Sequence, residues 1–320
     1  MNVRQYTQYA WGVVVFNLLV ILWGAVVRIT GSGAGCGSHW PLCNGEVVPL
    51  AGASKTLIEF GHRATSGLAL LAVFALVVFA RRLFPAGHLA RRGAYLSLFF
   101  ILVEAALGAG LVIFGLVEDN ASAARAVVIA VHLVNTFILL ACLALAAWWA
   151  ENDQPFQLRG RGKLPIALAT ALVAVMLVGA TGAVTALGDT LFPAESLAAG
   201  IAQDFAPDAH PLVQLRILHP AIAIVVAMGL ILLASSLRTQ GPEAQRWADR
   251  LFILVFVQVL AGAINFLLMA PIWMQLIHLL LADLLWLSLV LAGATALAAP
   301  DKTASDVESD KAVTGEPIPA

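Results

Sequence analysis

Eight long apolar segments, separated by short polar connections, set the pattern of the chain. Each has about 20 or more mainly apolar residues, the length that an α-helix needs to cross the hydrocarbon core of a bilayer. The pattern predicts an all-α membrane protein with eight transmembrane helices. We expect the first helix to be retained, because no small-residue cleavage site follows it. The segments are 8–28, 57–80, 93–117, 124–150, 164–187, 212–237, 250–270 and 273–298.

The composition narrows the class of protein further. The chain has 320 residues, of which 61% are hydrophobic and 12% are charged, and its mean hydropathy is +0.90. A soluble domain of this composition could not cover its surface with polar groups, so a soluble protein is excluded. The net charge of −1 and the lack of a basic arm give no reason to expect a nucleic-acid partner.

The distribution of Lys and Arg predicts the orientation, since cytoplasmic loops carry an excess of these residues. With the N-terminus inside, the cytoplasmic side holds thirteen of the 18 Lys and Arg residues, so both termini are predicted to be cytoplasmic. The polar segment 299–320 has no apolar period and is expected to be a disordered cytoplasmic tail. The cytoplasmic set comprises Arg4, Arg81, Arg82, Arg91, Arg92, Arg159, Arg161, Lys163, Arg238, Arg246, Arg250, Lys302 and Lys311.

The last four predicted helices repeat features of the first four. Corresponding residues lie 146 to 157 positions apart, which indicates a duplication with insertions and deletions in the loops. Because each unit has an even number of helices, two parallel, pseudo-symmetric four-helix bundles are predicted, over 1–150 and 151–298. The matches are Gly24-Ala25 with Gly179-Ala180, Val103-Glu104-x-x-x-Gly108-Ala109 with Val257-Gln258-x-x-x-Gly262-Ala263, His62 with His219, and His132 with His278.

Four of the matched residues are histidines inside predicted helices: His62, His132, His219 and His278. Counted from the outer helix ends, each lies roughly 8–12 Å below the outer surface. An imidazole inside a bilayer is costly unless it is satisfied, and a heme iron takes axial ligands from two opposite sides. The pattern predicts two bis-histidine heme sites, one in each half. The alternative is that each histidine only hydrogen-bonds a neighbouring helix, which the recurrence of all four disfavours.

The two predicted sites differ in the charge beside them. Glu59 lies one helical turn from His62, and the duplication places Arg216 at the corresponding position before His219. A carboxylate can accept a proton or stabilise a developing cation, whereas a guanidinium can only neutralise an anion such as a heme propionate. We therefore expect a reactive N-terminal site and a holding or electron-transfer site in the C-terminal half. Glu59 could also be a solvated acid at a helix start.

Two cysteines, Cys36 and Cys43, lie in the first long outer loop, which also contains several glycines and a proline. A short loop of this kind can bring two sulfur atoms together, and the outside of a cell is oxidising, so a disulfide is expected. The disulfide would be either a structural staple or a redox pair that exchanges with a partner. Cys142, inside the fourth predicted helix, is expected to be a small core residue.

Three other functions compete with a reactive heme site. A diheme cytochrome for electron transfer would use the same four histidines, but it would not need Glu59 and usually holds its hemes near opposite membrane faces. A membrane thiol oxidoreductase would centre on Cys36 and Cys43 and would not need buried histidines. A transporter with duplicated halves would show broken helices at the midplane, and the single such break, Pro220, lies beside His219.

These residues carry a resemblance to a known family. The motif Glu59-x-x-His62-Arg63, the loop from Thr30-Gly31-Ser32-Gly33 to Cys36 and Cys43, and the other three helix histidines resemble heme A synthase of the CtaA type. The resemblance covers all eight predicted helices, about residues 8–298. Some relatives have a second cysteine pair in the other long outer loop, but residues 188–211 contain no cysteine here.

The resemblance implies an oxidoreductase of the bacterial inner membrane that converts a ring methyl group of heme O into the formyl group of heme A, for terminal oxidase assembly. It implies that His62 and His132 hold the substrate heme O, that His219 and His278 hold a heme b cofactor, and that Glu59 is the catalytic acid. It points to heme O synthase as a partner. The electron acceptor is left open, with a quinone or a thiol-redox protein as candidates.

Overall fold

The structure, a computed structural model, describes residues 1–49 and 53–298. Over these ranges it is helical, and eight of its helical segments are long and apolar enough to cross a membrane. This confirms the predicted all-α membrane class, while the predicted tail 299–320 lies outside the described residues. The elements are α1 (Val3–Ile29), α2 (Ser54–Leu83), α3 (Leu89–Ile113), α4 (Ala123–Asn152), α5 (Leu164–Leu191), α6 (Leu197–Asp204), α7 (Pro211–Gln214), the 3₁₀ helix η1 (Leu215–Ile217), α8 (Leu218–Leu237), α9 (Pro242–Leu267) and α10 (Ile272–Leu297).

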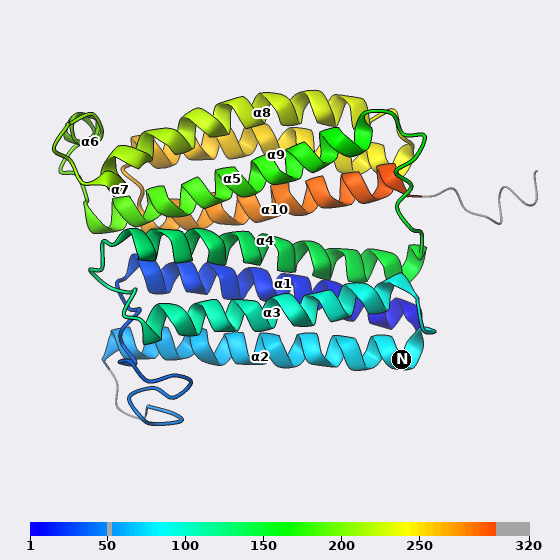
Figure 1. The fold of residues 1–320 in the computed structure, drawn as a ribbon, viewed down its shortest axis with the longest axis horizontal. Coiled ribbons are helices and arrows are strands. Elements are labelled where there is room, and N and C mark those ends of the chain that lie inside the picture. The colour runs from blue at the N-terminus through cyan, green and yellow to red at the C-terminus, as the bar shows by residue number, and fades with distance from the viewer. Residues whose placement is uncertain (50–52, 299–320) are drawn as a thin grey trace, which may run out of the picture.

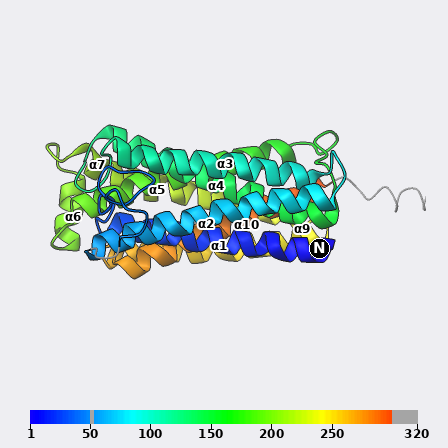
Figure 2. The same ribbon diagram turned by 90° about the horizontal axis from the view of Figure 1, so that it is seen from below.

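The long helices run side by side along one direction, as the two ribbon views show (Figures 1 and 2). Helices α1 to α4 pack against one another, and α5, α8, α9 and α10 form a second group beside them. The loop after α1 and the short helix α6 lie at one end of the molecule, whereas the N-terminus lies at the other (Figure 1). A symmetry between the two groups and a domain boundary near residue 150 stay predictions.

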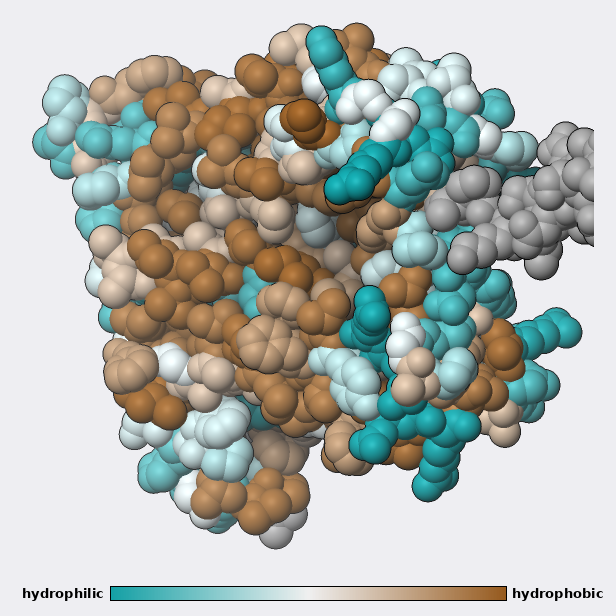
Figure 3. Space-filling model, turned by 45° about the vertical axis from the view of Figure 1, so that its right-hand side comes forward, coloured by the Kyte–Doolittle hydropathy of each residue, from teal (hydrophilic) through white to brown (hydrophobic). Residues whose placement is uncertain are grey.

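The surface has the distribution of side chains that a bilayer requires. Hydrophobic residues cover most of the length between the two ends, and hydrophilic residues gather at the ends (Figure 3). Large apolar side chains such as Leu71 on α2 and Leu232 on α8 are exposed over 64% and 73% of their surface. Exposing so many apolar side chains to water would be unfavourable. The apolar surface between the two ends of the molecule therefore indicates contact with lipid. The chain is a multi-pass membrane protein.

The best-buried helices lie where the two groups meet. α4 and α10 have the largest buried shares of any predicted span, and they contact each other. Trp286 on α10 donates its indole N–H to the carbonyl oxygen of Phe137 on α4 at 2.6 Å, and their rings stack with centroids 5.1 Å apart. Near the end that carries the long loops, Arg28 on α1 donates hydrogen bonds to the Ala186 carbonyl oxygen and the Thr190 hydroxyl of α5, both at 2.7 Å.

Several helix ends differ from the predicted ones by four or more residues, and the end of α3 and the start of α9 have a local explanation. α3 ends at Ile113, not near 117, because Gly115 adopts a left-handed conformation (φ 62°) that closes the helix. α9 begins at Pro242, eight residues earlier than predicted, since Gly241 and a proline at the first helical position start a polar turn outside the apolar stretch. The helix α6 was not predicted at all, because its eight residues lie in a loop that hydropathy alone leaves irregular.

The sixth predicted span is not a continuous α-helix. The structure places this span at Pro211–Leu237 and divides it into α7, the 3₁₀ turn η1 and α8. Pro220 has no backbone N–H, so it cannot donate the α-helical hydrogen bond to the residue four positions earlier, Arg216. The tighter turn directly before His219 is consistent with this missing bond.

Candidate heme-binding sites

The four helix histidines lie at matching depths. His62, His132, His219 and His278 are each six to nine residues inside the end of the span that faces the long loops, which is roughly 9–14 Å at 1.5 Å per residue. All four are partly buried. The helix bounds therefore support the single level that the sequence predicted.

A glycine on the preceding long helix faces each of the four imidazole rings. A Cβ atom at Gly24 on α1 would lie 3.0 Å from Cε1 of His62, and one at Gly182 on α5 would lie 2.9 Å from Cε1 of His219. The corresponding distances are 3.8 Å from Gly108 to His132 and 3.1 Å from Gly262 to His278. In at least three of the four places only glycine leaves room for the ring without a shift.

This packing changes one detail of the sequence comparison. The duplication paired Gly24 with Gly179, but the glycine beside His219 is Gly182. Gly179 faces the ring of Phe137 instead, with 2.6 Å between its Cβ position and Cε2 of Phe137. By its contact with a histidine, Gly182 is the counterpart of Gly24, three residues further along α5 than the sequence match suggested.

The separation of the C-terminal histidine rings matches the distance that one iron between two imidazoles would give. The ring centroids of His219 and His278 are 6.4 Å apart, and the rings are nearly perpendicular at 88°. With metal–nitrogen bonds of about 2 Å, two imidazoles on opposite sides of one metal have centroids roughly 6 Å apart. A bis-histidine iron therefore fits between these two side chains.

The hydrogen-bond partners of His219 also favour binding of a metal by this residue. Its Nδ1 lies 3.2 Å from the Val178 carbonyl oxygen and 3.4 Å from the Thr181 hydroxyl. A proton on Nδ1 that is donated to a carbonyl leaves the lone pair of Nε2 free for a metal, which is the usual arrangement around metal-bound histidines. The Nε2 atom of His278 lies 3.4 Å from the side-chain nitrogen of Gln258 on α9.

In the N-terminal pair, His132 has a charged neighbour. Its Nε2 lies 2.9 Å from Oε1 of Glu104 on α3. The carboxylate also accepts hydrogen bonds of 2.5 Å from the Thr136 hydroxyl and from the Asn135 side chain. Sequence reasoning named Glu104 only as part of a repeated motif and assigned it no role. The available signal was an acid inside an apolar helix, at the position that Gln258 occupies in the other half.

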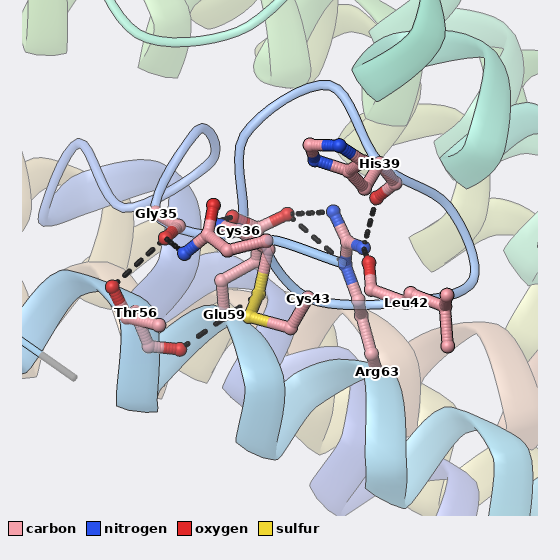
Figure 4. The surroundings of a disulfide bond; sticks show 9 residues. Gly35, Cys36, His39, Leu42, Cys43, Thr56, Glu59 and Arg63 are labelled. Carbon is pink, nitrogen blue, oxygen red and sulfur yellow. Dashed lines mark hydrogen bonds and ion pairs between the residues drawn. A yellow bond between two sulfur atoms is a disulfide. The ribbon is translucent and has the colours of Figure 1, made fainter. Parts of the chain in front are cut away.

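Glu59 lies one turn from His62 and is 3% exposed, so it is not a solvated acid at a helix start. Its Oε2 accepts a hydrogen bond of 2.7 Å from the backbone N–H of Cys36, and its Oε1 lies 2.5 Å from a guanidinium nitrogen of Arg63 (Figure 4). Arg63 in turn donates to the carbonyl oxygens of His39 and Leu42 at 2.6 and 2.7 Å. The carboxylate is thus bound to the loop as well as being near the histidine. Its catalytic role stays a prediction.

The disulfide expected between Cys36 and Cys43 is present. Both residues are buried, and the loop that carries them folds onto the start of α2 (Figure 4). The Thr56 hydroxyl donates a 2.8 Å hydrogen bond to the Gly35 carbonyl oxygen. A Cβ at Gly35 would lie 2.5 Å from the carbonyl oxygen of Lys55, so this contact requires glycine. The free thiol of Cys142 is buried in α4, as expected for a core residue.

Arg216 has several partners of its own. It donates to the carbonyl oxygens of Gly188 and Phe192 at 3.2 and 2.8 Å, and it lies 3.3 Å from Asp189 and 3.7 Å from Asp204. Burial raises the pKa of the Asp204 carboxyl, and Arg216 acts in the opposite direction. The guanidinium is thus already paired within the protein. Its predicted contact with a heme propionate stays a prediction.

The donor set suits a porphyrin-bound iron better than a bare metal ion. Among residues 1–49 and 53–298, no group of three or more His, Cys, Asp or Glu side chains is placed to hold a metal. A porphyrin supplies four nitrogen ligands itself, so two histidines complete the coordination of its iron. The fold and these residues together define a polytopic membrane protein with four helix histidines near one end of its spans.

Comparison with known proteins identifies the family. The family model described as cytochrome oxidase assembly protein, COX15-CtaA, matches residues 7–290. The chain therefore belongs to the COX15-CtaA family, which confirms the resemblance inferred from the sequence motifs.

Two relatives carry different names. A protein of Thermus thermophilus named protoheme IX farnesyltransferase is 53% identical over 292 residues, which are 90% of this chain and 48% of that protein. A heme A synthase of Bacillus cereus is 38% identical over 144 residues, which are 44% of this chain and 43% of that protein. The chain thus spans about half the length of these relatives or less.

Proposed function

We propose that this protein is a heme A synthase, which oxidises a ring methyl group of heme O to a formyl group. The observation that carries the proposal is the pair of histidine sites at one level, with a buried acid of the Glu59-x-x-His62-Arg63 motif beside only one of them. The family match and the name of the Bacillus cereus relative support it.

We assign the two sites to different hemes. His219 and His278 hold a heme b cofactor, because their separation fits one iron and His219 already donates through Nδ1. His62 and His132 hold the substrate heme O, next to Glu59. A heme b held by His219 and His278 would supply one-electron redox chemistry beside the substrate site. We further propose that the halves are domains, over 1–150 and 151–298.

The buried carboxylate of Glu59 has a defined part in this reaction. Converting a methyl group into an aldehyde removes hydrogen from one carbon and adds an oxygen atom. Positive charge develops on that carbon when an electron leaves before the matching proton. A fixed carboxylate in a site that excludes water stabilises such charge more strongly than it would in water, and it can also accept a proton. The Cys36 N–H and Arg63 hold the two carboxylate oxygens in place, so little reorganisation is needed during the reaction.

The location follows from the same assignment. We propose that the protein lies in a bacterial inner membrane with both termini in the cytoplasm, supported by the excess of Arg and Lys at the end that holds the N-terminus. The histidines and the disulfide loop would then lie near the outer face. This placement fits a disulfide, since that side is oxidising.

The name of the Thermus thermophilus relative raises a second candidate, transfer of a farnesyl group to protoheme. That protein is about twice as long as the matched region, so its name need not describe the part shared with this chain. We assign the farnesyl transfer to the part that this chain does not cover. The two reactions act on the same porphyrin in succession, which makes a heme O synthase the expected partner.

Product analysis tests this assignment. The purified protein is incubated with heme O in one sample, and with protoheme plus farnesyl diphosphate in another, and the extracted hemes are identified by mass. Heme A formed from heme O supports the proposal. Heme O formed from protoheme would show a farnesyltransferase. If two hemes bind but neither reaction occurs, the protein is a diheme cytochrome, although both histidine pairs lie near one face and so do not span the membrane.

A further inference from the structure

The two halves differ in the side chain that faces the second histidine of each pair. Glu104 on α3 faces His132 on α4, and Gln258 on α9 faces His278 on α10. The contacts differ in length, with 2.9 Å to the carboxylate oxygen and 3.4 Å to the amide nitrogen. The strong contact therefore occurs in the half assigned to the substrate, and the weak one in the half assigned to the cofactor.

The contact with Glu104 engages the nitrogen that an iron would use. A hydrogen bond from Nε2 to a carboxylate requires the proton on Nε2, so that this nitrogen has no lone pair available for a metal. For Nε2 to bind iron, its hydrogen bond to Glu104 must break and the proton must move to Nδ1. The imidazole stays neutral, and one hydrogen bond is exchanged for one iron–nitrogen bond.

The Glu104 carboxylate is held in position by further hydrogen bonds, so it stays within reach of Nε2 of His132. Its Oε1, the atom that contacts His132, also accepts a 2.5 Å hydrogen bond from Thr136, and its Oε2 accepts one from Asn135. Asn135 is itself fixed by a 3.0 Å hydrogen bond to the Phe100 carbonyl oxygen. Hydrogen bonds to an ionised acceptor are roughly twice as strong as neutral ones.

Gln258 offers little competition in the other half. Its amide nitrogen is 3.4 Å from His278, at the outer limit of a hydrogen bond, and its Oε1 is buried without a hydrogen-bond partner among the described residues. An amide nitrogen is also a donor, so it cannot take the proton of an Nε2–H group. At 3.4 Å the amide N–H makes only a weak hydrogen bond to the Nε2 lone pair of His278, which a bond to iron would replace at little cost.

We propose that Glu104 is a positioning residue that competes with iron for Nε2 of His132, so that the N-terminal site releases its porphyrin while the C-terminal site retains its own. The inference rests on the proposed assignment of substrate and cofactor sites. An enzyme must release its product after each turnover but keep its cofactor. The difference between Glu104 and Gln258 would let one site release its porphyrin and the other retain it, although the two histidine pairs are otherwise similar.

The test measures heme release rather than product formation. The full-length wild-type protein and the Glu104→Gln variant are loaded with hemin, and transfer of the porphyrin to excess apomyoglobin is followed by absorbance. Glu104→Gln should release heme from the N-terminal site several-fold more slowly, because a neutral amide oxygen holds the Nε2 proton of His132 less strongly than a carboxylate does. Its heme content should rise toward two per chain. Adding His132→Ala should abolish both effects.

Further variants separate this inference from general damage. Gln258→Glu should make the C-terminal site lose heme faster, and Thr136→Val should weaken the contact of Glu104 with His132 and slow release from the N-terminal site. Glu151→Gln, an exposed change at the far end of α4, should leave both rates unchanged. The C-terminal heme spectrum shows that the variants at Glu104, Thr136 and Glu151 are folded, and a monodisperse elution profile shows it for every variant, including Gln258→Glu.

Unchanged or faster release from Glu104→Gln would overturn the inference, as would failure of both wild type and variant to load a second heme. This outcome is distinguishable from failure of the proposed function. A protein that makes no heme A can still release porphyrin more slowly after Glu104→Gln. Conversely, an active synthase can have the same release rate with and without this substitution.

Discussion

The backbone N–H of Cys36 donates a 2.7 Å hydrogen bond to the carboxylate of Glu59. One residue belongs to the disulfide and the other to the motif that ends in a candidate heme ligand, His62. The position of the acid therefore depends on the fold of the loop, and the loop depends on the acid and its ion pair with Arg63. A change in either should therefore affect both.

Replacing Glu59 with Gln should show whether the protein acts as a heme A synthase or only as an electron-transfer cytochrome. The variant keeps the size and one hydrogen-bond acceptor of the side chain but loses its negative charge, so both hemes should still bind. Loss of a preorganised charge of this kind costs about 3–4 kcal/mol, so heme A formation should fall a hundredfold or more. The rate is measured with heme O, alongside protein yield and disulfide content. A normal rate would leave Glu59 with a structural role only.

The histidine pairs should respond differently to alanine substitution. His219→Ala and His278→Ala should abolish the low-spin spectrum of the resident heme, because both axial nitrogens are needed for that state. His62→Ala and His132→Ala should leave that spectrum largely intact and abolish product formation. Spectra of the reduced proteins and heme extraction provide the measurement. Loss of the resident heme from the N-terminal variants alone would reverse the assignment of the two sites.

The glycines beside the histidines offer a test of the ring packing. Gly182→Ala places a methyl group 2.9 Å from Cε1 of His219, so the ring must shift and the affinity for the resident heme should fall about tenfold or more. Gly229→Ala on α8 is a matched control, because no atom lies within 4 Å of its Cβ position. That control should be neutral or slightly stabilising. Equal heme retention in both variants would argue against the close contact with His219.

Replacing Cys36 and Cys43 with Ser should show what the disulfide does. Closing so short a loop stabilises a fold by about 2–3 kcal/mol on the chain-entropy model. We therefore expect the double variant to insert and to keep its resident heme. Product formation should fall, because without the disulfide the loop holds the backbone N–H of residue 36 less firmly against Glu59.

Wild-type protein treated with reductant is the matched comparison, since it breaks the same bond without a substitution. If activity follows the thiol state and returns on reoxidation, the cysteines form a redox pair. A parallel loss of yield and activity in the double variant would instead identify a structural staple, and full activity with normal yield would contradict both roles.

The sequence alone determined the features that depend on local requirements. A span must contain about 20 apolar residues whatever surrounds it, so the eight spans could be predicted from hydropathy. The shared depth of His62, His132, His219 and His278 then followed from counting along each span. The Cys36–Cys43 disulfide followed in the same way, because a short loop brings its own ends together.

Only the tertiary structure decided which side chains meet across helices. In a membrane the lipid-facing and core-facing sides of a helix are both apolar, so hydropathy does not fix how each helix is rotated about its axis. The match of Gly24 with Gly179 was therefore three residues out, and the contact of Glu104 with His132 could not be predicted. Likewise, the burial of Glu59 against Cys36 depends on a loop folding onto another helix. Such contacts arise from packing between segments distant in sequence, and no local pattern encodes them.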